Sequence, residues 1–306
     1  MSKPSPELVT AVTDRVVGRR REIEQVVAAL AGRRHLLLEG PPGTGKSTLL
    51  RAVAEELGRG FAFVEGNAEL TPARLVGAFD PAAVLDRGYH AEAFLDGPLA
   101  TALRSGSLLY VEEINRIPEE TLNVLIGVMS EGLIHVPRLG PVEAAEGFGL
   151  VAAMNPFDAV GTARISSAVY DRCCRLAMGY QEAGDEILVV ARTSPHSAAQ
   201  LGAGFLTQAV DMVRATREHP DIRTGASVRG AIDFSILAAE LAVLRDVATT
   251  EPSVTLDAAL LALTGRVRVR DGANATAEQI ITSLWQRFFG PPADPSDNTG
   301  EANPKA

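Results

Sequence analysis

The sequence predicts an α/β domain with a parallel sheet, followed by a smaller all-helical domain. Short apolar runs alternate with segments of helical periodicity between residues 35 and 178, which is typical of parallel strands covered by helices on both faces. After about Gln181 the chain changes to long alanine- and leucine-rich stretches at helical spacing. A length of 306 residues is sufficient for two such domains.

The first domain is predicted to begin with a helix. Residues 7–32 carry apolar side chains at helical spacing and end in glycine, a common helix terminus. A helix from Ser47 to Leu57 follows the first strand and ends before Gly58. The predicted strands are His35–Glu39, Phe61–Glu65, Ser107–Glu112, Phe148–Met154 and Cys174–Met178. We therefore assign residues 14–181 to this domain and predict a flexible N-terminus over residues 1–13.

The second domain is predicted to span residues 182–289 as a helical lid with little strand. Its predicted helices are Phe205–Thr216, Val228–Ala248, Leu256–Leu263 and Ala277–Phe289. Residues 290–306 are rich in proline and polar residues and lack aromatic residues, so this tail is predicted to be disordered.

The composition favours a cytoplasmic protein without a membrane span. No apolar stretch approaches the roughly 20 residues that a spanning helix requires. A formal net charge of -9 also makes a nucleic acid an unlikely partner. The two cysteines, Cys173 and Cys174, are adjacent, which suits neither a disulfide framework nor a zinc site, so we predict reduced and buried thiols.

A phosphate-binding loop follows the first predicted strand. Residues 40–47 read GPPGTGKS and fit the pattern GxxxxGK[ST] at every fixed position, between a strand and a helix as that motif requires. Lys46, which with Lys3 and Lys305 makes up all the lysines, would reach the outer phosphates, and the Ser47 hydroxyl would bind Mg²⁺. The predicted nucleotide-binding residues of the loop are Gly40, Pro41, Pro42, Gly43, Thr44, Gly45, Lys46, Ser47 and Thr48.

An apolar strand that ends in two acids provides the second element that hydrolysis needs. Leu108, Leu109, Tyr110 and Val111 are followed by Glu112 and Glu113. Glu113 is predicted to be the general base that activates water. Glu112 occupies the metal-side position where aspartate is usual, and we expect its extra methylene to slow turnover without abolishing it.

Four segments together resemble the MoxR family of AAA+ ATPases and their relative, the magnesium-chelatase ATPase subunit. They are VVGR from Val16, GPPGTGKS, FLDGPLATAL, and EEINRIPEETLNVLIGVMSEG, and the similarity covers roughly residues 16–230. The resemblance implies a P-loop NTPase fold with a three-layer αβα AAA+ domain and a helical lid. It also implies hydrolysis of ATP with Mg²⁺ in a homo-oligomeric ring, usually a hexamer, with a chaperone-like role. A von Willebrand factor A domain protein is a frequent partner of this family.

The same resemblance assigns further site residues. Asn155, in VAAMNPFD, matches sensor 1, and Arg172 matches the arginine finger that reaches the nucleotide of the next subunit. Arg229 matches sensor 2 at the start of a lid helix, and Val17 and Gly18 match the adenine pocket.

The sequence departs from the family at two places. Cys173 and Cys174 stand where Phe-Leu is usual, and Val228 stands where proline is usual. Residues 77–97 match the helix 2 insertion of the family. This segment is either a projection toward the ring pore or a partner, or a surface loop. Residues 134–143 match the hairpin before sensor 1.

Three alternative functions remain open at this stage. Because Glu112 replaces the usual aspartate, the chain could be a nucleotide-gated binding protein with little turnover. Because relatives in the clade include DNA helicases, it could also be a nucleic-acid motor. A magnesium-chelatase subunit is a narrower alternative. The client protein is not identified by the sequence.

Overall fold

The computed structural model describes residues 5–156 and 165–290. The chain divides into two compact units, Met1–Gln181 and Glu182–Ala306, and each is described by itself. Residues 1–4 of the predicted flexible N-terminus and residues 291–306 of the predicted disordered tail lie outside the described residues. Within the described ranges, no helix is both long and apolar enough to cross a membrane.

The first unit is built on a five-stranded parallel sheet with the order β2-β5-β8-β1-β9. The strands are β1 (His35–Glu39), β2 (Phe61–Glu65), β5 (Leu108–Glu112), β8 (Gly149–Met154) and β9 (Cys173–Ala177). All five predicted strands are therefore confirmed to within one residue at each end, and the predicted α/β fold is confirmed.

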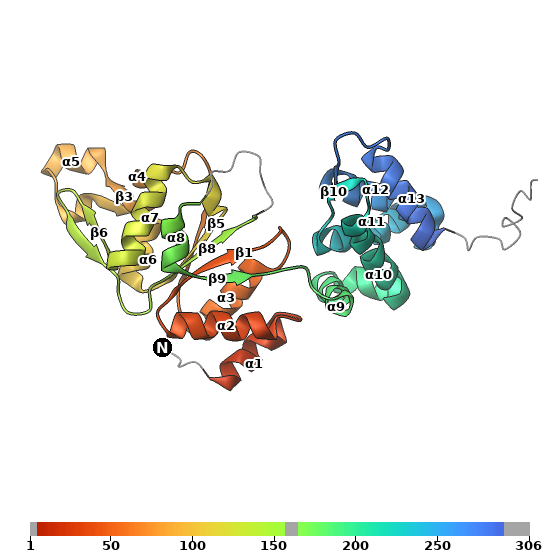
Figure 1. Cartoon of the computed structure of the whole chain (residues 1–306), viewed down its shortest axis with the longest axis horizontal. Helices are drawn as coiled ribbons and strands as arrows, with labels where there is room; N and C mark the ends of the chain where they lie inside the picture. The colour runs from red at the N-terminus through yellow and green to blue at the C-terminus, as the bar shows by residue number, and fades with distance from the viewer. Residues whose placement is uncertain (1–4, 157–164, 291–306) are drawn as a thin grey trace, which may run out of the picture. The chain divides into compact units, whose positions relative to one another are not determined.

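Helices cover both faces of this sheet, and Figure 1 shows α1, α2 and α3 on the side opposite α6, α7 and α8. The helices of this unit are α1 (Pro6–Arg15), α2 (Arg20–Ala31), α3 (Lys46–Glu56), α4 (Pro72–Val76), α5 (Pro81–Arg87), α6 (Pro98–Ser105), α7 (Glu119–Glu131) and α8 (Ser167–Arg172). Two short 3₁₀ turns are η1 (Ala91–Ala93) and η2 (Ile114–Arg116).

The alternation of side chains along each strand produces one hydrophobic cluster on each face. Leu37 belongs to the cluster under α6 and α7, whereas Leu36 and Leu38 belong to the cluster under α1, α2 and α3. On the neighbouring strand β5, Leu109 and Tyr110 divide between the clusters in the same way. Successive residues of a strand point to opposite faces, so a continuous apolar run here fills two cores.

The N-terminal region differs from the prediction in two respects. Residues 6–15 form α1 and bury Leu8, Val9 and Val12, so the predicted flexible N-terminus is wrong for this part. The single predicted helix over residues 7–32 is instead two helices, because the chain leaves α1 at Val16 and turns at Gly18, whose φ is 65°.

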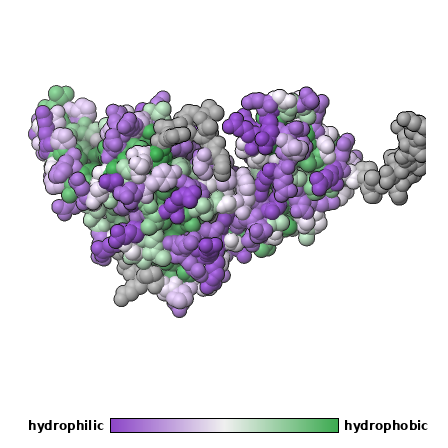
Figure 2. Space-filling view, viewed as in Figure 1, coloured by the Kyte–Doolittle hydropathy of each residue, from purple (hydrophilic) through white to green (hydrophobic). Residues whose placement is uncertain are grey.

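Two antiparallel strand pairs lie outside the five-stranded sheet. Residues 77–97 form β3 (Gly77–Phe79), α5, η1 and β4 (Phe94–Asp96), and the hairpin expected at residues 134–143 forms β6 (Leu133–Val136) and β7 (Gly140–Glu143). The guanidinium carbon of Arg138, in the hairpin turn, lies 3.8 Å from the ring centre of Tyr89. Figure 2 shows hydrophobic residues at the surface around α5, where Leu85 is 89% exposed.

The second unit is mainly helical. Its elements are α9 (Ala183–Thr193), α10 (Pro195–Glu218), β10 (Ile222–Thr224), α11 (Val228–Arg245), α12 (Pro252–Leu263), η3 (Thr264–Arg266), β11 (Arg268–Val269) and α13 (Ala277–Phe289). The four predicted helices are present. α10 is broken at Gly202, whose φ of 80° and ψ of 165° are not helical, and the helix predicted from Phe205 is the part of α10 after this break. A short antiparallel pair, β10 with β11, was not predicted, because each strand has only two or three residues.

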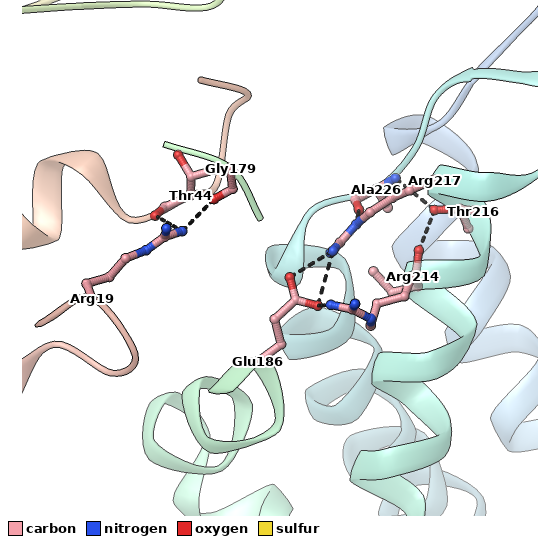
Figure 3. A network of polar contacts seen from close by, with 9 residues as sticks. Arg19, Thr44, Gly179, Glu186, Arg214, Thr216, Arg217 and Ala226 are labelled. Atoms are coloured by element: carbon pink, nitrogen blue, oxygen red, sulfur yellow. Dashed lines mark hydrogen bonds and ion pairs between the residues drawn. The ribbon is translucent and has the colours of Figure 1, made fainter. Parts of the chain in front are cut away.

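A buried polar network joins three segments of the second unit (Figure 3). Glu186, on α9, is 2% exposed and pairs with Arg214 at 3.3 Å and Arg217 at 2.9 Å, both on α10. Arg217 also donates to the carbonyl of Ala226, and the Ala226 amide donates to the Thr216 hydroxyl. This network fixes the segment that leads into α11.

Candidate functional site

The loop of residues 40–47 connects the buried strand β1 to the N-terminus of α3. Gly45 is the N-cap of α3 with a φ of 84°, a left-handed conformation that strongly favours glycine. Glycine also offers no side chain to cap the helix, so the first-turn amide N–H groups stay available to an anion, which the helix dipole favours. The local geometry therefore suits a phosphate group.

Lys46 is folded back onto this loop. Its side chain is largely buried, with the residue 7% exposed, and Nζ donates to the carbonyl oxygens of Gly40 and Pro41, each at 2.9 Å. The Thr44 hydroxyl lies 3.5 Å from the same nitrogen and itself donates to Pro41. In these three contacts the ammonium group faces uncharged oxygens of the loop, and a negatively charged phosphate oxygen would be a stronger partner for it.

Three oxygens gather beside the loop. The Ser47 hydroxyl lies 3.4 Å from the Tyr110 hydroxyl and 3.5 Å from a carboxylate oxygen of Glu112. Burial raises the pKa of Tyr110 well above its ordinary value, so this side chain stays a neutral hydroxyl that can donate a hydrogen bond. Sequence reasoning missed Tyr110, and the only signal was a hydroxyl inside an otherwise apolar strand.

Glu113 follows the end of β5 in a strained position. Its φ of 53° and ψ of 44° are left-handed, which is uncommon for a residue with a side chain and frequent at functional sites. Its carboxylate forms an ion pair with Arg116, with 3.1 Å between Oε2 and Nε.

One cavity of about 230 Å³ brings five of the predicted site residues together. Lys46, Glu112, Glu113 and Asn155 line it, and the remaining lining residues are Pro42, Arg116, Ala153 and Met154. They come from the carboxyl ends of β1, β5 and β8, which are neighbours in the sheet, the usual place for ligands in open α/β sheets. The arrangement offers an ammonium, two carboxylates and an amide to one ligand, as a metal-bound polyphosphate requires.

Other predicted residues lie outside this cavity. Arg172 ends α8 and donates to the Ser130 hydroxyl of α7 and to the Ala168 carbonyl. Val17 and Gly18 form the turn between α1 and α2, and the Val17 carbonyl accepts a hydrogen bond from Gln181.

Arg229 and the two cysteines also lie outside this cavity. Arg229 lies in the first turn of α11 and is exposed. The prediction of two buried thiols is wrong for Cys174, which is exposed, while Cys173 is half-buried; both are free. β9 is an edge strand, and consecutive side chains on it point to opposite sides.

Arg19 is a buried residue that supports the loop and that sequence reasoning did not assign to the site. It is 4% exposed, and Nη2 donates to the carbonyls of Thr44 at 3.1 Å and Gly179 at 2.6 Å (Figure 3). Its Nη1 pairs with Glu22 at 2.8 Å. Because Thr44 belongs to the loop and Gly179 follows β9, Arg19 ties the loop to the segment after the last strand.

Glu39 connects the same loop to α8. This buried carboxylate, at the last position of β1, accepts a hydrogen bond from the Tyr170 hydroxyl at 2.9 Å and pairs with Arg175 of β9 at 2.5 Å. Tyr170 lies two residues before Arg172 on α8. The base of the loop and the helix that ends in Arg172 are therefore in direct contact.

Comparison with known proteins finds a family similarity within the first unit. Residues 35–173 match the family model described as AAA domain (dynein-related subfamily). The YeaC protein of Bacillus subtilis, described as uncharacterized, is 28% identical over 252 residues, which cover 75% of this chain and 76% of that protein. The gas vesicle ATPase GvpN of Ancylobacter aquaticus is 30% identical over 228 residues, covering 67% of this chain and 60% of GvpN.

A solved structure has the same fold. The RuvB Holliday junction branch migration motor of Thermotoga maritima superimposes with a TM-score of 0.53 at 17% identity, over 82% of this chain and 72% of that chain. At this identity the similarity concerns the fold alone, and it extends beyond the residues that the AAA family model matches.

Proposed function

We propose that this chain is an AAA+ ATPase that hydrolyses ATP with Mg²⁺ as a MoxR-like member of that class, in a ring, to remodel or mature a partner protein. The observation that carries the proposal is the convergence of Lys46, Glu113 and Asn155 on one cavity at the ends of three neighbouring strands. The match to the AAA domain and the similarity to the ATPase GvpN support the same activity.

The side chains beside the loop fit a nucleotide with its metal. Ser47 and Glu112 present oxygen atoms 3.5 Å apart, and oxygen is the ligand type that Mg²⁺ prefers. Lys46 would contact the outer phosphates from its buried position. Mg²⁺, when bound, would neutralise part of the phosphate charge. The Glu112 carboxylate reaches toward Ser47 despite its extra methylene, which supports turnover at this site.

We assign each remaining predicted residue a separate task in hydrolysis or nucleotide binding. Glu113 accepts the proton of the attacking water, and Asn155 orients that water or contacts the terminal phosphate. Arg172 reaches the nucleotide of a neighbouring subunit, where its charge stabilises the transferred phosphoryl group. Arg229 contacts phosphate from the helical unit, and Val17 with Gly18 contacts the adenine.

The partner proposal rests on the resemblance to the MoxR family. We propose a cytoplasmic homo-oligomer, most simply a hexamer, that acts on a client together with a von Willebrand factor A domain protein. The exposed side chains of Leu85 and Tyr89 around α5 provide an apolar surface for such contacts.

A trap variant tests the proposal. Glu113→Gln should bind ATP without hydrolysing it, so the purified variant with ATP should run at the mass of a ring in light scattering and retain its partner. Glu119→Gln, an exposed acid at the start of α7, is the matched control and should release the partner as the unsubstituted chain does. A monomer in the presence of saturating ATP would contradict the ring, and a ring that retains no protein would contradict the remodelling role.

A further inference from the structure

Arg116 is a cavity residue that the proposed mechanism does not use. It lies three residues after Glu113, at the end of the 3₁₀ turn η2, and the two side chains form an ion pair of 3.1 Å. Both line the cavity that Lys46 and Asn155 also line. The side chains are 40% and 38% exposed, so the pair lies at the rim of the cavity, partly open to solvent.

The backbone around Glu113 is held on several sides. The Arg116 amide donates to the Glu113 carbonyl at 2.8 Å, and the turn is anchored by the buried side chain of Ile114. Behind it lies Gly66, whose amide donates to the Glu112 carbonyl and whose added Cβ would lie 2.4 Å from the Glu113 carbonyl oxygen. With the backbone fixed in this way, rotation of the side chain decides where the Glu113 carboxylate lies.

An ion pair of this exposure adds little to the stability of the chain. Partly exposed pairs typically contribute about 0 to 1 kcal/mol. The planar guanidinium nevertheless restricts a carboxylate more closely than an ammonium does, because its N–H groups have fixed directions. The expected effect of the pair is therefore on the orientation of Glu113 and not on folding.

We propose that Arg116 is a positioning residue for hydrolysis, which holds the Glu113 carboxylate in the cavity and acts through it. The inference rests on the proposed role of Glu113 as general base. Arg116 acts on the substrate only through Glu113, because it orients the carboxylate that activates the water.

A double-mutant cycle on single-turnover ATP hydrolysis separates this role from direct action on the nucleotide. Arg116→Ala should lower the rate about 10-fold, in keeping with the sensitivity of catalysis to small misplacements, and leave the Kd for ATP within about two-fold. In the Glu113→Gln background the same substitution should cause no further loss. Arg116→Lys, which keeps the charge, should recover part of the rate. Arg33→Ala is the control, since Arg33 pairs with Glu146 on the surface before β1, with 80% and 75% exposure.

The outcomes distinguish the inference from the proposed function. An Arg116→Ala rate equal to the unsubstituted rate would overturn the inference. The inference would also be overturned if Arg116→Ala lowered the rate by the same factor in the unsubstituted chain and in the Glu113→Gln background. If Glu113→Gln itself hydrolyses ATP at the normal rate, the base assignment and the inference fall together. A slow Glu113→Gln with a normal Arg116→Ala overturns the inference alone.

Discussion

Replacing Arg19 by methionine tests whether the buried guanidinium supports the phosphate-binding loop. The substitution keeps an unbranched side chain of similar length but removes the donors to the carbonyls of Thr44 and Gly179 and the pair with Glu22. Hydrogen bonds from charged groups contribute about 1.5 to 3 kcal/mol each to stability. Part of this loss is offset in the methionine variant, because the cost of burying the charged guanidinium is removed as well. We therefore expect a loss of about 3 kcal/mol in the free energy of unfolding of the first unit.

The affinity for ATP should fall in the same variant. Because Thr44 lies in the loop, we expect Arg19→Met to weaken ATP binding about 10-fold in a fluorescence titration, while denaturant unfolding measures the stability loss. The adjacent Arg20→Met is the matched control: Arg20 is 61% exposed, pairs only with Glu24 among the ion pairs of the described residues, and should change stability by less than about 1 kcal/mol. If the two variants unfold and bind ATP alike, Arg19 does not support the loop.

Three further substitutions or modifications test other parts of the structure. Glu186→Gln should destabilise the helical unit by about 3 kcal/mol, since it leaves two arginines facing an uncharged amide, and the single tryptophan of the chain can follow the unfolding; no shift in the transition would contradict this. Burial raises the pKa of Cys173 to about 12, so its thiol stays protonated at pH 8, and a thiol reagent should modify exposed Cys174 at least 10-fold faster; two equally fast thiols would refute it. Gly66→Ala should slow hydrolysis or unfold the first unit, because the new Cβ would displace the Glu113 carbonyl, and normal activity would show that the turn can shift.

The sheet and the loop were predictable because their signals are local. Five short apolar runs gave five strands, and the pattern of the residues from Gly40 to Ser47 identified the loop between β1 and α3. The carboxyl ends of parallel strands lie at one edge, so Glu113 and Asn155 could be expected near the loop. The structure places both at the same cavity.

Contacts between distant segments were not predictable from the pattern. Arg19 contacts Gly179, which is 160 residues away, and the Tyr110 hydroxyl lies beside the Ser47 hydroxyl. Arg19 stands in the VVGR segment, but that segment gave no indication of which residues it contacts, and Tyr110 had no signal beyond its residue type. The break between α1 and α2 was also missed, because helical spacing continues on both sides of Gly18 and only the backbone reveals the turn.

Steady-state phosphate release tests the central claim most directly. The purified chain with ATP and Mg²⁺ should release phosphate continuously, and Glu113→Gln should lower the rate at least 100-fold while the Kd for ATP stays within about two-fold, since general-base catalysis contributes about 10² to 10⁴. Glu119→Gln should retain the unsubstituted rate. Equal rates for the unsubstituted chain and Glu113→Gln would contradict the assignment of this cavity as the site of ATP hydrolysis.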